Sequence, residues 1–322
     1  MSASGTPRLA LLALAALSLI WGYNWVVMKQ VIQYVDPFDF SAIRTVLGAV
    51  TLFLVLLVLR KPMSLVAVRQ VVLLGVLQTG AFTALIQWAL VAGGAGKTAV
   101  LVYTMPFWVI PMAWWVLGER VRGLQWAAIA IAGSGLVLIL QPWSMGGSAL
   151  SNLLAVAGGV TWAASAVLAK RMRRDHAFDL LALTAWQMLF GAIALSVLAG
   201  LHPSRPIDPT PYFYGALFFN AVFATGRAWL LWLYILQRLS TGMAGLSALG
   251  IPMIGALAGW IELGERPNAA EFTGMALIVG ALAMISLWSL VQSRRAGGGG
   301  RSGRAGLTAR PRRYFTRPRI TS

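Results

Sequence analysis

Residues 123–169 read GLQWAAIAIAGSGLVLILQPWSMGGSALSNLLAVAGGVTWAASAVLA, a stretch of 47 positions without one charged side chain. As a single helix this stretch would be about 70 Å long, more than twice the roughly 30 Å hydrocarbon core of a membrane. The residues from Gln141 to Ser148, in its middle, are rich in Gly, Pro and Ser, which favour turns. The stretch therefore predicts two membrane-spanning helices joined by a tight hairpin.

The composition of the whole chain agrees with a lipid environment. Of its 322 residues, 58% are hydrophobic and 11% are charged, against roughly 25% charged residues in an average soluble domain. That balance excludes both a water-soluble globule and a disordered chain. The chain has no Cys and two His, which excludes disulfides and thiolate ligands and leaves little for a metal site. We predict no enzyme activity, no catalytic residues, no metal and no cofactor.

Ten segments are apolar over about 20 residues, the length that a spanning helix needs. The first could instead be a cleaved signal peptide, because residues 13–15 loosely fit a cleavage site, but the ten-segment pattern favours a span. The sequence thus predicts an all-α membrane protein with ten transmembrane helices. The segments are 9–29, 39–59, 71–92, 98–118, 123–141, 149–169, 179–200, 211–236, 241–262 and 271–291.

The distribution of Lys and Arg predicts the orientation. The connectors and termini on the side of the N-terminus hold 20 of the 26 Lys and Arg, and the other side holds four. The positive-inside rule therefore places both termini in the cytoplasm. Nine of the Arg lie in residues 294–322, which contain no acid. We predict that this Arg/Gly-rich tail is disordered and contacts anionic lipid rather than nucleic acid.

The chain contains an internal repeat. Trp21 and Lys29 match Trp162 and Lys170 with a shift of 141, and Leu-Gly-Glu-Arg occurs at 117–120 and again at 263–266, with a shift of 146. Residues 96 and 242, both Gly, match at that second shift. We therefore predict two five-helix repeats, residues 1–141 and 142–293. Because five is odd, the second repeat is inverted in the membrane, which is typical of secondary transporters.

The same residues resemble a known family. Trp21-Gly22, Lys29, Pro37-Phe38, Arg44, Pro106 and the first Leu-Gly-Glu-Arg, with the second copy from Trp162 to Gly280, look like the EamA-type branch of the drug/metabolite transporter superfamily over residues 9–291. The resemblance implies a ten-helix inner-membrane carrier with a central cavity lined by both halves. Relatives export amino acids and other metabolites, or move sugars and nucleotide-sugars. Related small multidrug proteins use a mid-membrane Glu for proton antiport, and this chain has no acid at the corresponding position.

Polar and aromatic residues at mid-span are candidates to line the cavity, because small-molecule sites are mostly apolar with a few polar groups. Arg227 is the candidate anchor for a carboxylate or phosphate, since a guanidinium donates two hydrogen bonds to such groups. The alternative is that Arg227 snorkels to the headgroups. The predicted substrate-binding residues are Trp21, Asn24, Gln78, Tyr103, Trp108, Trp162 and Arg227.

Three further features carry expectations. Arg44, inside the second span, is expected to pair with Asp36 or Asp39 or to snorkel, rather than to contact a ligand. Prolines 106 and 252 are expected to break the fourth and ninth helices near their middles, where transporters place gates and sites. Glu262 is the deepest of the nine acids and a poor candidate for proton coupling.

Together these features predict a multi-pass inner-membrane secondary transporter that exports small metabolites such as amino acids by alternating access. An importer or exchanger of sugars, nucleotide-sugars or phosphorylated metabolites stays open because of the two intramembrane arginines. An integral membrane enzyme and a non-transporting scaffold or sensor are disfavoured. The expected partners are a small-molecule substrate and membrane lipid, with the chain a monomer or a homodimer.

Overall fold

A computed structural model of the chain describes residues 6–143, 149–238 and 247–298. Its regular structure over these residues is entirely helical. The helices of the first repeat are α1 (Thr6–Val31), α2 (Pro37–Val58), α3 (Val68–Leu74), η1 (Gly75–Ala81), α4 (Phe82–Ala92), α5 (Ala95–Val102), α6 (Met105–Leu117) and α7 (Gly123–Leu140). Those of the second are α8 (Ala149–Asp175), α9 (Leu180–Leu201), α10 (Pro211–Phe218), η2 (Phe219–Arg227), α11 (Ala228–Arg238), α13 (Ser247–Leu263) and α14 (Ala269–Gly298).

The described helices account for the predicted spans. Eight of them are long and apolar enough to cross a membrane, counting α3–η1–α4 and α5–α6 as one rod each. A shorter apolar helix covers Leu249–Leu263, and the helical run α10–η2–α11 lies where the sequence predicts the eighth span. The predicted all-helical membrane fold with two repeats is confirmed.

Local signals set the helix ends. Asp36 caps α2, with its carboxylate 2.9 Å from the Phe38 amide, and Asp179 caps α9 in the same way. At the other ends of α6 and α13, Gly118 and Gly264 take the left-handed conformation, with φ of 67° and 66°. Only glycine adopts that conformation without strain. The two Leu-Gly-Glu-Arg copies are thus equivalent helix C-caps, as the repeat implies.

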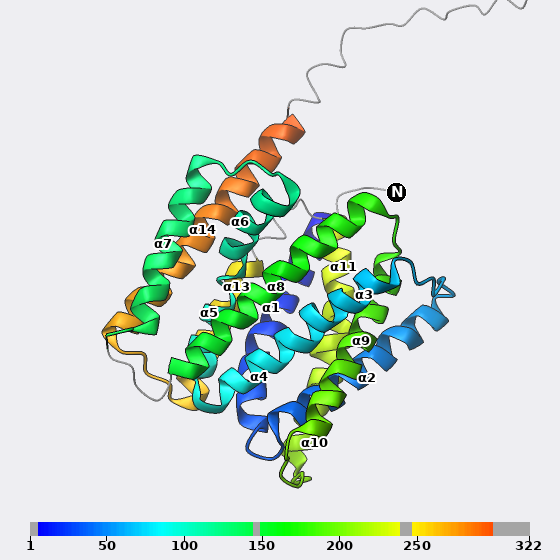
Figure 1. Cartoon of the computed structure of the whole chain (residues 1–322). Coiled ribbons are helices and arrows are strands. Elements are labelled where there is room, and N and C mark those ends of the chain that lie inside the picture. The colour runs from blue at the N-terminus through cyan, green and yellow to red at the C-terminus, as the bar shows by residue number, and fades with distance from the viewer. Residues whose placement is uncertain (1–5, 144–148, 239–246, 299–322) are drawn as a thin grey trace, which may run out of the picture.

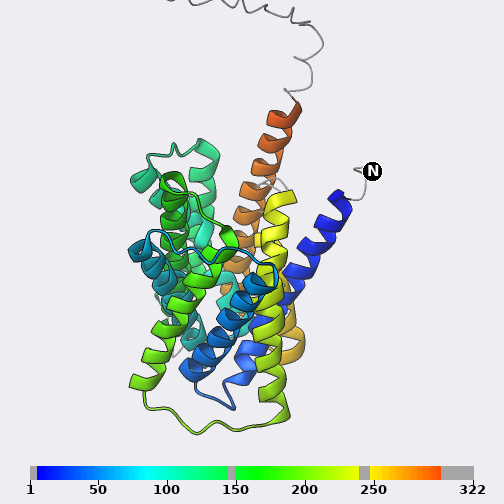
Figure 2. The ribbon, with the colours of Figure 1, turned by 90° about the vertical axis from the view of Figure 1, so that its right-hand side faces the viewer.

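The helices pair across the two repeats. α1 packs on α13, α2 on α9, α4 and α6 on α8, and α7 on α14. Figures 1 and 2 show the start of α1 and the end of α14 at the same end of the bundle. We call this the termini end and the opposite one the far end. Because no half packs on itself alone, the core belongs to both repeats.

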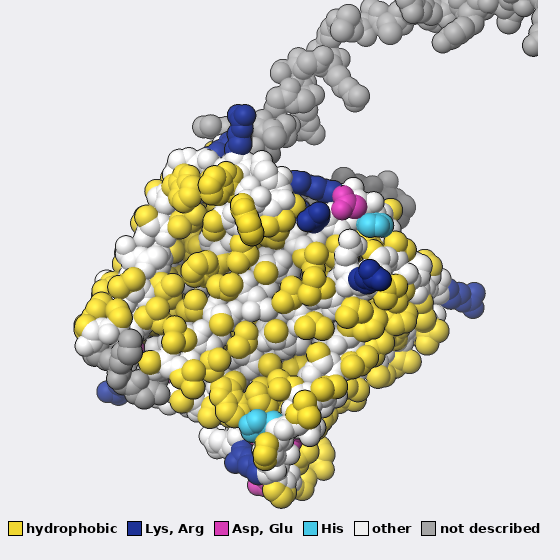
Figure 3. All heavy atoms as spheres, viewed as in Figure 1, with side chains coloured by type: hydrophobic (Ala, Val, Ile, Leu, Met, Phe, Trp, Pro, Cys, Tyr) yellow, Lys and Arg dark blue, Asp and Glu magenta, His cyan; other side chains and the backbone are white. Residues whose placement is uncertain are grey.

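The outside of the bundle is apolar. Large hydrophobic side chains such as Leu57, Trp115 and Ile261 are exposed, and Figure 3 shows apolar side chains covering the middle of one face, with the charged ones near its ends. An apolar surface of that extent would be unfavourable in water and fits lipid. The chain is therefore a multi-pass membrane protein.

Some sequence expectations are corrected. The fourth span is two helices, α5 and α6, interrupted just before Pro106, as predicted, whereas α13 runs without interruption across Pro252. The helix α14 continues past Arg294 to Gly298, into the segment predicted to be a disordered tail. The tip of the 141–148 hairpin, Gly242 and the tail beyond Gly298 lie outside the described residues.

Candidate functional site

Two helices widen into π-helix at equivalent places in the repeats. The segment η1 covers Gly75–Ala81, and the shift of 146 maps it onto residues 221–227, inside η2. π-Helical turns are rare and are frequently found at functional sites. Gln78 lies in η1 and Arg227 is the last residue of η2. Sequence reasoning missed both segments, because hydropathy does not distinguish π from α turns.

Two of the predicted site residues lie at the break between α5 and α6, and a third, Trp162, lies on α8, the helix that packs against both. Tyr103 sits in the break and is 7% exposed. Trp108 donates from Nε1 to the Thr104 hydroxyl at 3.1 Å. From α8, Gly159 approaches the break so closely that a Cβ there would be 2.9 Å from the Val102 carbonyl oxygen. Trp162 follows Gly159 by three residues and therefore shares its helix face.

Trp21 belongs to a second group. Its Nε1 donates to the Ala224 carbonyl in η2 at 2.9 Å, and its ring lies 6.1 Å from that of Trp229 and 6.3 Å from that of Trp232. Asn24, one turn along α1, is buried, and its Oδ1 has no partner among the described residues. Tyr103 belongs to a hydrophobic cluster against which Trp21 packs.

Gln78 and Arg227 lie apart from these two groups of candidate residues. Gln78 is half-buried, and no hydrogen bond joins its side chain to another candidate among the described residues. Arg227 is exposed, with its guanidinium carbon 5.0 Å from the Phe223 ring centroid. An exposed arginine over an aromatic ring agrees with the snorkelling alternative better than with a buried anchor.

Arg44 is the intramembrane charge that the bundle buries. It is 9% exposed, and its Nη1 donates to the Asn220 amide oxygen at 3.3 Å. Neither Asp36 nor Asp39 forms an ion pair with it among the described residues. The expected ion pair or snorkelling is therefore wrong. Nearness in the sequence suggested the wrong partner, because the residue that contacts Arg44 comes from η2, far along the chain.

At the far end, two charged side chains bind the helix ends that meet between α4 and α5. Lys29 donates from Nζ to the Leu90 carbonyl at the end of α4 at 2.6 Å. Glu265 accepts from the amides of Ala95 and Gly96 at the start of α5, at 2.5 and 2.9 Å. A cation at a helix C-terminus and an anion at an N-terminus are both favoured by the helix dipole. Since Glu265 belongs to the second repeat, the contact joins the halves.

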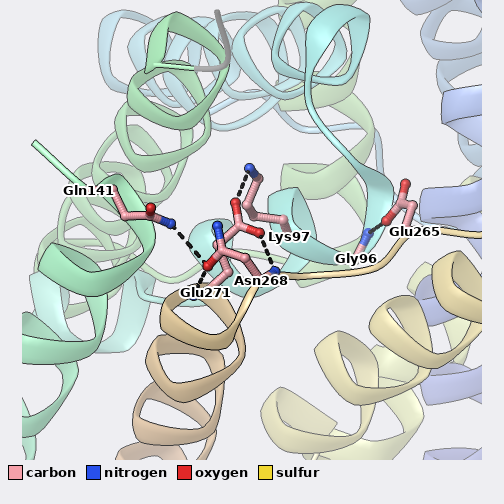
Figure 4. A network of polar contacts seen from close by, with 6 residues as sticks. All are labelled: Gly96, Lys97, Gln141, Glu265, Asn268 and Glu271. Atoms are coloured by element: carbon pink, nitrogen blue, oxygen red, sulfur yellow. Dashed lines mark hydrogen bonds and ion pairs between the residues drawn. The ribbon is translucent and has the colours of Figure 1, made fainter. Parts of the chain in front are cut away.

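A second cross-repeat contact lies beside it (Figure 4). Lys97 of α5 pairs with Glu271 of α14 at 2.8 Å, with both side chains less than a fifth exposed. Glu271 also accepts from the Asn268 amide, and Gln141 at the end of α7 donates to the Asn268 side chain at 3.3 Å. The far end is therefore held together by contacts between the two repeats.

At the termini end, the equivalent residues make different contacts. Glu119, the repeat equivalent of Glu265, pairs with Lys170 at 2.7 Å and with Arg174 at 2.8 Å. Lys170 is itself the equivalent of Lys29. Thus the carboxylate and the ammonium bind each other at this end, whereas at the far end each binds a helix terminus.

Glu262 also joins elements of both repeats. It accepts from the Tyr23 hydroxyl at 2.9 Å and from the Gln30 amide at 3.2 Å. Tyr212 of α10 donates to the Gln30 side-chain oxygen. The carboxylate thus ties α13 to α1, and through Gln30 to α10.

The connector between α8 and α9 carries a further ion pair, between Lys61 and Asp179 at 2.8 Å. Burial alone would raise the pKa of the Asp179 carboxyl. The Lys61 ammonium and the amides of Leu181 and Ala182 outweigh burial and hold that pKa below its usual value.

No group of three or more His, Cys, Asp or Glu side chains that could hold a metal ion occurs within the described ranges.

Known proteins resemble the chain over most of its length. The model of the EamA-like transporter family matches residues 8–141 and again 149–287. The chain is 27% identical over 274 residues to the uncharacterized transporter YoaV of Bacillus subtilis (strain 168), covering 83% of this chain and 93% of that one. It is 27% identical over 279 residues to a probable amino-acid metabolite efflux pump of Escherichia coli (strain K12), covering 82% and 90%. A protein of known crystal structure shares the fold, with a TM-score of 0.63, 19% identity and coverage of 88% and 98%.

Proposed function

Because the chain belongs to the EamA-like transporter family, we propose that it is an inner-membrane secondary transporter that exports small metabolites such as amino acids by alternating access. The family makes it a membrane transporter. The substrate class and the direction are our proposal. Its similarity to a probable amino-acid metabolite efflux pump supports them. The excess of Lys and Arg at the termini end supports a cytoplasmic location for both termini.

One observation carries the mechanism: equivalent residues at the two ends make different contacts. In an inverted repeat, each end of the bundle is built from the same parts. Here Glu265 and Lys29 hold the helix ends at the far end, while Glu119 and Lys170 pair with each other at the termini end. In the opposite state we expect the two ends to exchange these arrangements. Such an exchange would open the far end and close the other.

The substrate path that we propose runs between two groups of residues, one at the α5–α6 break and one on α1. Tyr103, Trp108 and Trp162 border it at the α5–α6 break, and Trp21 and Asn24 border it on α1. Gln78 in η1 is the polar residue of the third helix that could reach it. Arg227 stays a candidate only at the edge of this path, because its side chain is exposed.

The far-end contact between Lys97 and Glu271 offers a direct test. Because the chain has no Cys, a variant with Lys97→Cys and Glu271→Cys can be cross-linked at these positions alone by a short, reducible bis-methanethiosulfonate reagent. The variant and the single substitutions would be produced in a bacterium, and amino acids in the medium would be profiled against an empty-vector strain. The single substitutions control for loss of the ion pair.

We expect specific amino acids to accumulate outside the cells, export to stop when the double variant is cross-linked, and reductant to restore it. Undiminished export by the cross-linked protein would contradict alternating access through the far end. If no metabolite accumulates and a labelled sugar or phosphorylated metabolite enters instead, the export proposal is wrong.

A further inference from the structure

The guanidinium of Arg44 has one free edge inside the bundle. Nη1 donates to the Asn220 oxygen, whereas Nε is fully buried and has no acceptor among the described residues. Asn220 is itself fixed, because its Nδ2 donates to the Ala216 carbonyl at 3.1 Å. No hydrogen bond to Nε or Nη2 occurs among the described residues, and this is the edge of a guanidinium that binds a carboxylate with two parallel hydrogen bonds.

The surroundings of Arg44 leave its charge without compensation. Asp36 is the other charged residue among the buried side chains that the structure describes, and it caps α2 two turns away. Near the guanidinium lie the neutral Asn220 and the ring of Phe40, whose centroid is 5.9 Å away. A buried cation without an anion is unfavourable in a membrane. A bound anion would remove that penalty.

The amount of negative charge needed to balance Arg44 indicates which class of anion fits. One guanidinium with neutral neighbours is balanced by a single negative charge, as on a carboxylate. A phosphate monoester carries close to two negative charges at neutral pH, so its second charge would be buried without a partner. A carboxylate is therefore favoured over a phosphate.

We propose that Arg44, held by Asn220, is the binding site for the carboxylate of a monoanionic or zwitterionic substrate. This inference rests on the proposed function and narrows its substrate class. It also moves the anionic anchor from Arg227 to α2. The π-helical turn of η2 places Asn220 beside Arg44, so any rearrangement of η2 would change how tightly the carboxylate is held.

Three probes with one ring and different charges test the site: benzoate, benzamide and phenyl phosphate. Thermal unfolding of the purified full-length protein in detergent reports their binding, because a ligand of the native state raises the melting temperature. We expect benzoate to stabilise the wild type and the other two probes to bind at least about tenfold more weakly. Arg238→Gln, at an exposed arginine on α11, is the matched control and should keep the benzoate response.

Two variants remove the site in opposite ways. Arg44→Gln removes the donor and should abolish the benzoate shift. Asn220→Asp keeps the size of the side chain and supplies an internal carboxylate, so it should melt at a higher temperature than wild type without ligand and lose the benzoate shift. The second variant keeps the test decisive if the first does not fold.

A benzoate response that survives Asn220→Asp, or phenyl phosphate binding as tight as benzoate binding, would overturn the proposal. The proposal would also be overturned if benzoate did not stabilise the wild type. The same holds if Arg227→Gln lost the benzoate response while Arg44→Gln kept it. Binding through Arg44 without any export would contradict the transport function and leave the site standing. If the protein exports metabolites while folded Arg44→Gln and Asn220→Asp variants still bind benzoate as the wild type does, the transport function stands and the Arg44 site is wrong.

Discussion

Thr225 of η2 lies against Gly48 of α2 so closely that a Cβ at Gly48 would be 2.4 Å from the Thr225 Cγ2. The equivalent residue of the first repeat, Thr79 of η1, lies against Gly191 of α9 in the same way, with a distance of 2.3 Å from its Cβ. Each contact joins a π-helical segment of one repeat to the second helix of the other. Glycine is required because the helix axes approach too closely for any side chain.

The first prediction concerns these glycines. Gly48→Ala and Gly191→Ala should each destabilise the protein by about 1–3 kcal/mol, because overpacking forces the helices apart. Thermal unfolding in detergent measures the change. Gly133→Ala is the control, since no atom lies within 4 Å of its added Cβ, and alanine there should be neutral or stabilising. Equal stability of the Gly48 and Gly133 variants would contradict the packing argument.

The second prediction tests the aromatic group at the α5–α6 break. Trp162→Ala should lower export by about tenfold or more, because a large aromatic contact with the solute is lost. Export is measured at matched protein levels in the membrane. Trp115→Ala removes a side chain that is 84% exposed to lipid and should leave export unchanged. Equal losses in the two variants would mean that Trp162 acts through general stability.

The third prediction concerns the start of α5. Glu265→Gln replaces charge-assisted hydrogen bonds to the amides of Ala95 and Gly96 with weaker ones, a loss of about 1–2 kcal/mol. Hydrogen exchange of the amides at residues 95–98, followed by mass spectrometry, should become about tenfold faster. Glu119→Gln should leave exchange there unaltered, because Glu119 lies at the opposite end. Unchanged exchange in Glu265→Gln would show that the cap does not hold α5.

The fourth prediction follows from the lowered pKa of Asp179. Its charge stabilises the folded protein at pH values above the carboxyl's ordinary pKa, and this contribution is lost as the pH falls through the lower, folded-state pKa. Asp179→Asn can still cap α9, so it removes the charge alone. The melting temperature of this variant should lie below that of wild type at neutral pH, and the gap should close under acid conditions. A gap that persists unchanged in acid would contradict the assignment; Asp175→Asn, at an exposed neighbour, is the control.

The spans, the repeat and the helix caps could all be predicted from the amino-acid sequence. A span must satisfy its own backbone hydrogen bonds in lipid, so it appears as a continuous apolar segment. The Leu-Gly-Glu-Arg copies likewise act through residues next to them, because Gly118 and Gly264 end their helices in the left-handed conformation that glycine favours. The spans and the caps depend on residues close together in the chain, and the repeat is found by comparing two parts of the sequence directly.

The contacts of the charged residues were decided by the tertiary structure. The sequence offers Asp36 and Asp39 as neighbours of Arg44, yet its partner is Asn220, brought there by the packing of η2 on α2. Nor does the sequence distinguish Glu265 from Glu119, although one caps a helix of the other repeat and the other pairs with Lys170. Equivalent sequences differ here because each carboxylate takes the partner that the packing of the two repeats places within hydrogen-bond distance, and that packing is not encoded in local hydropathy.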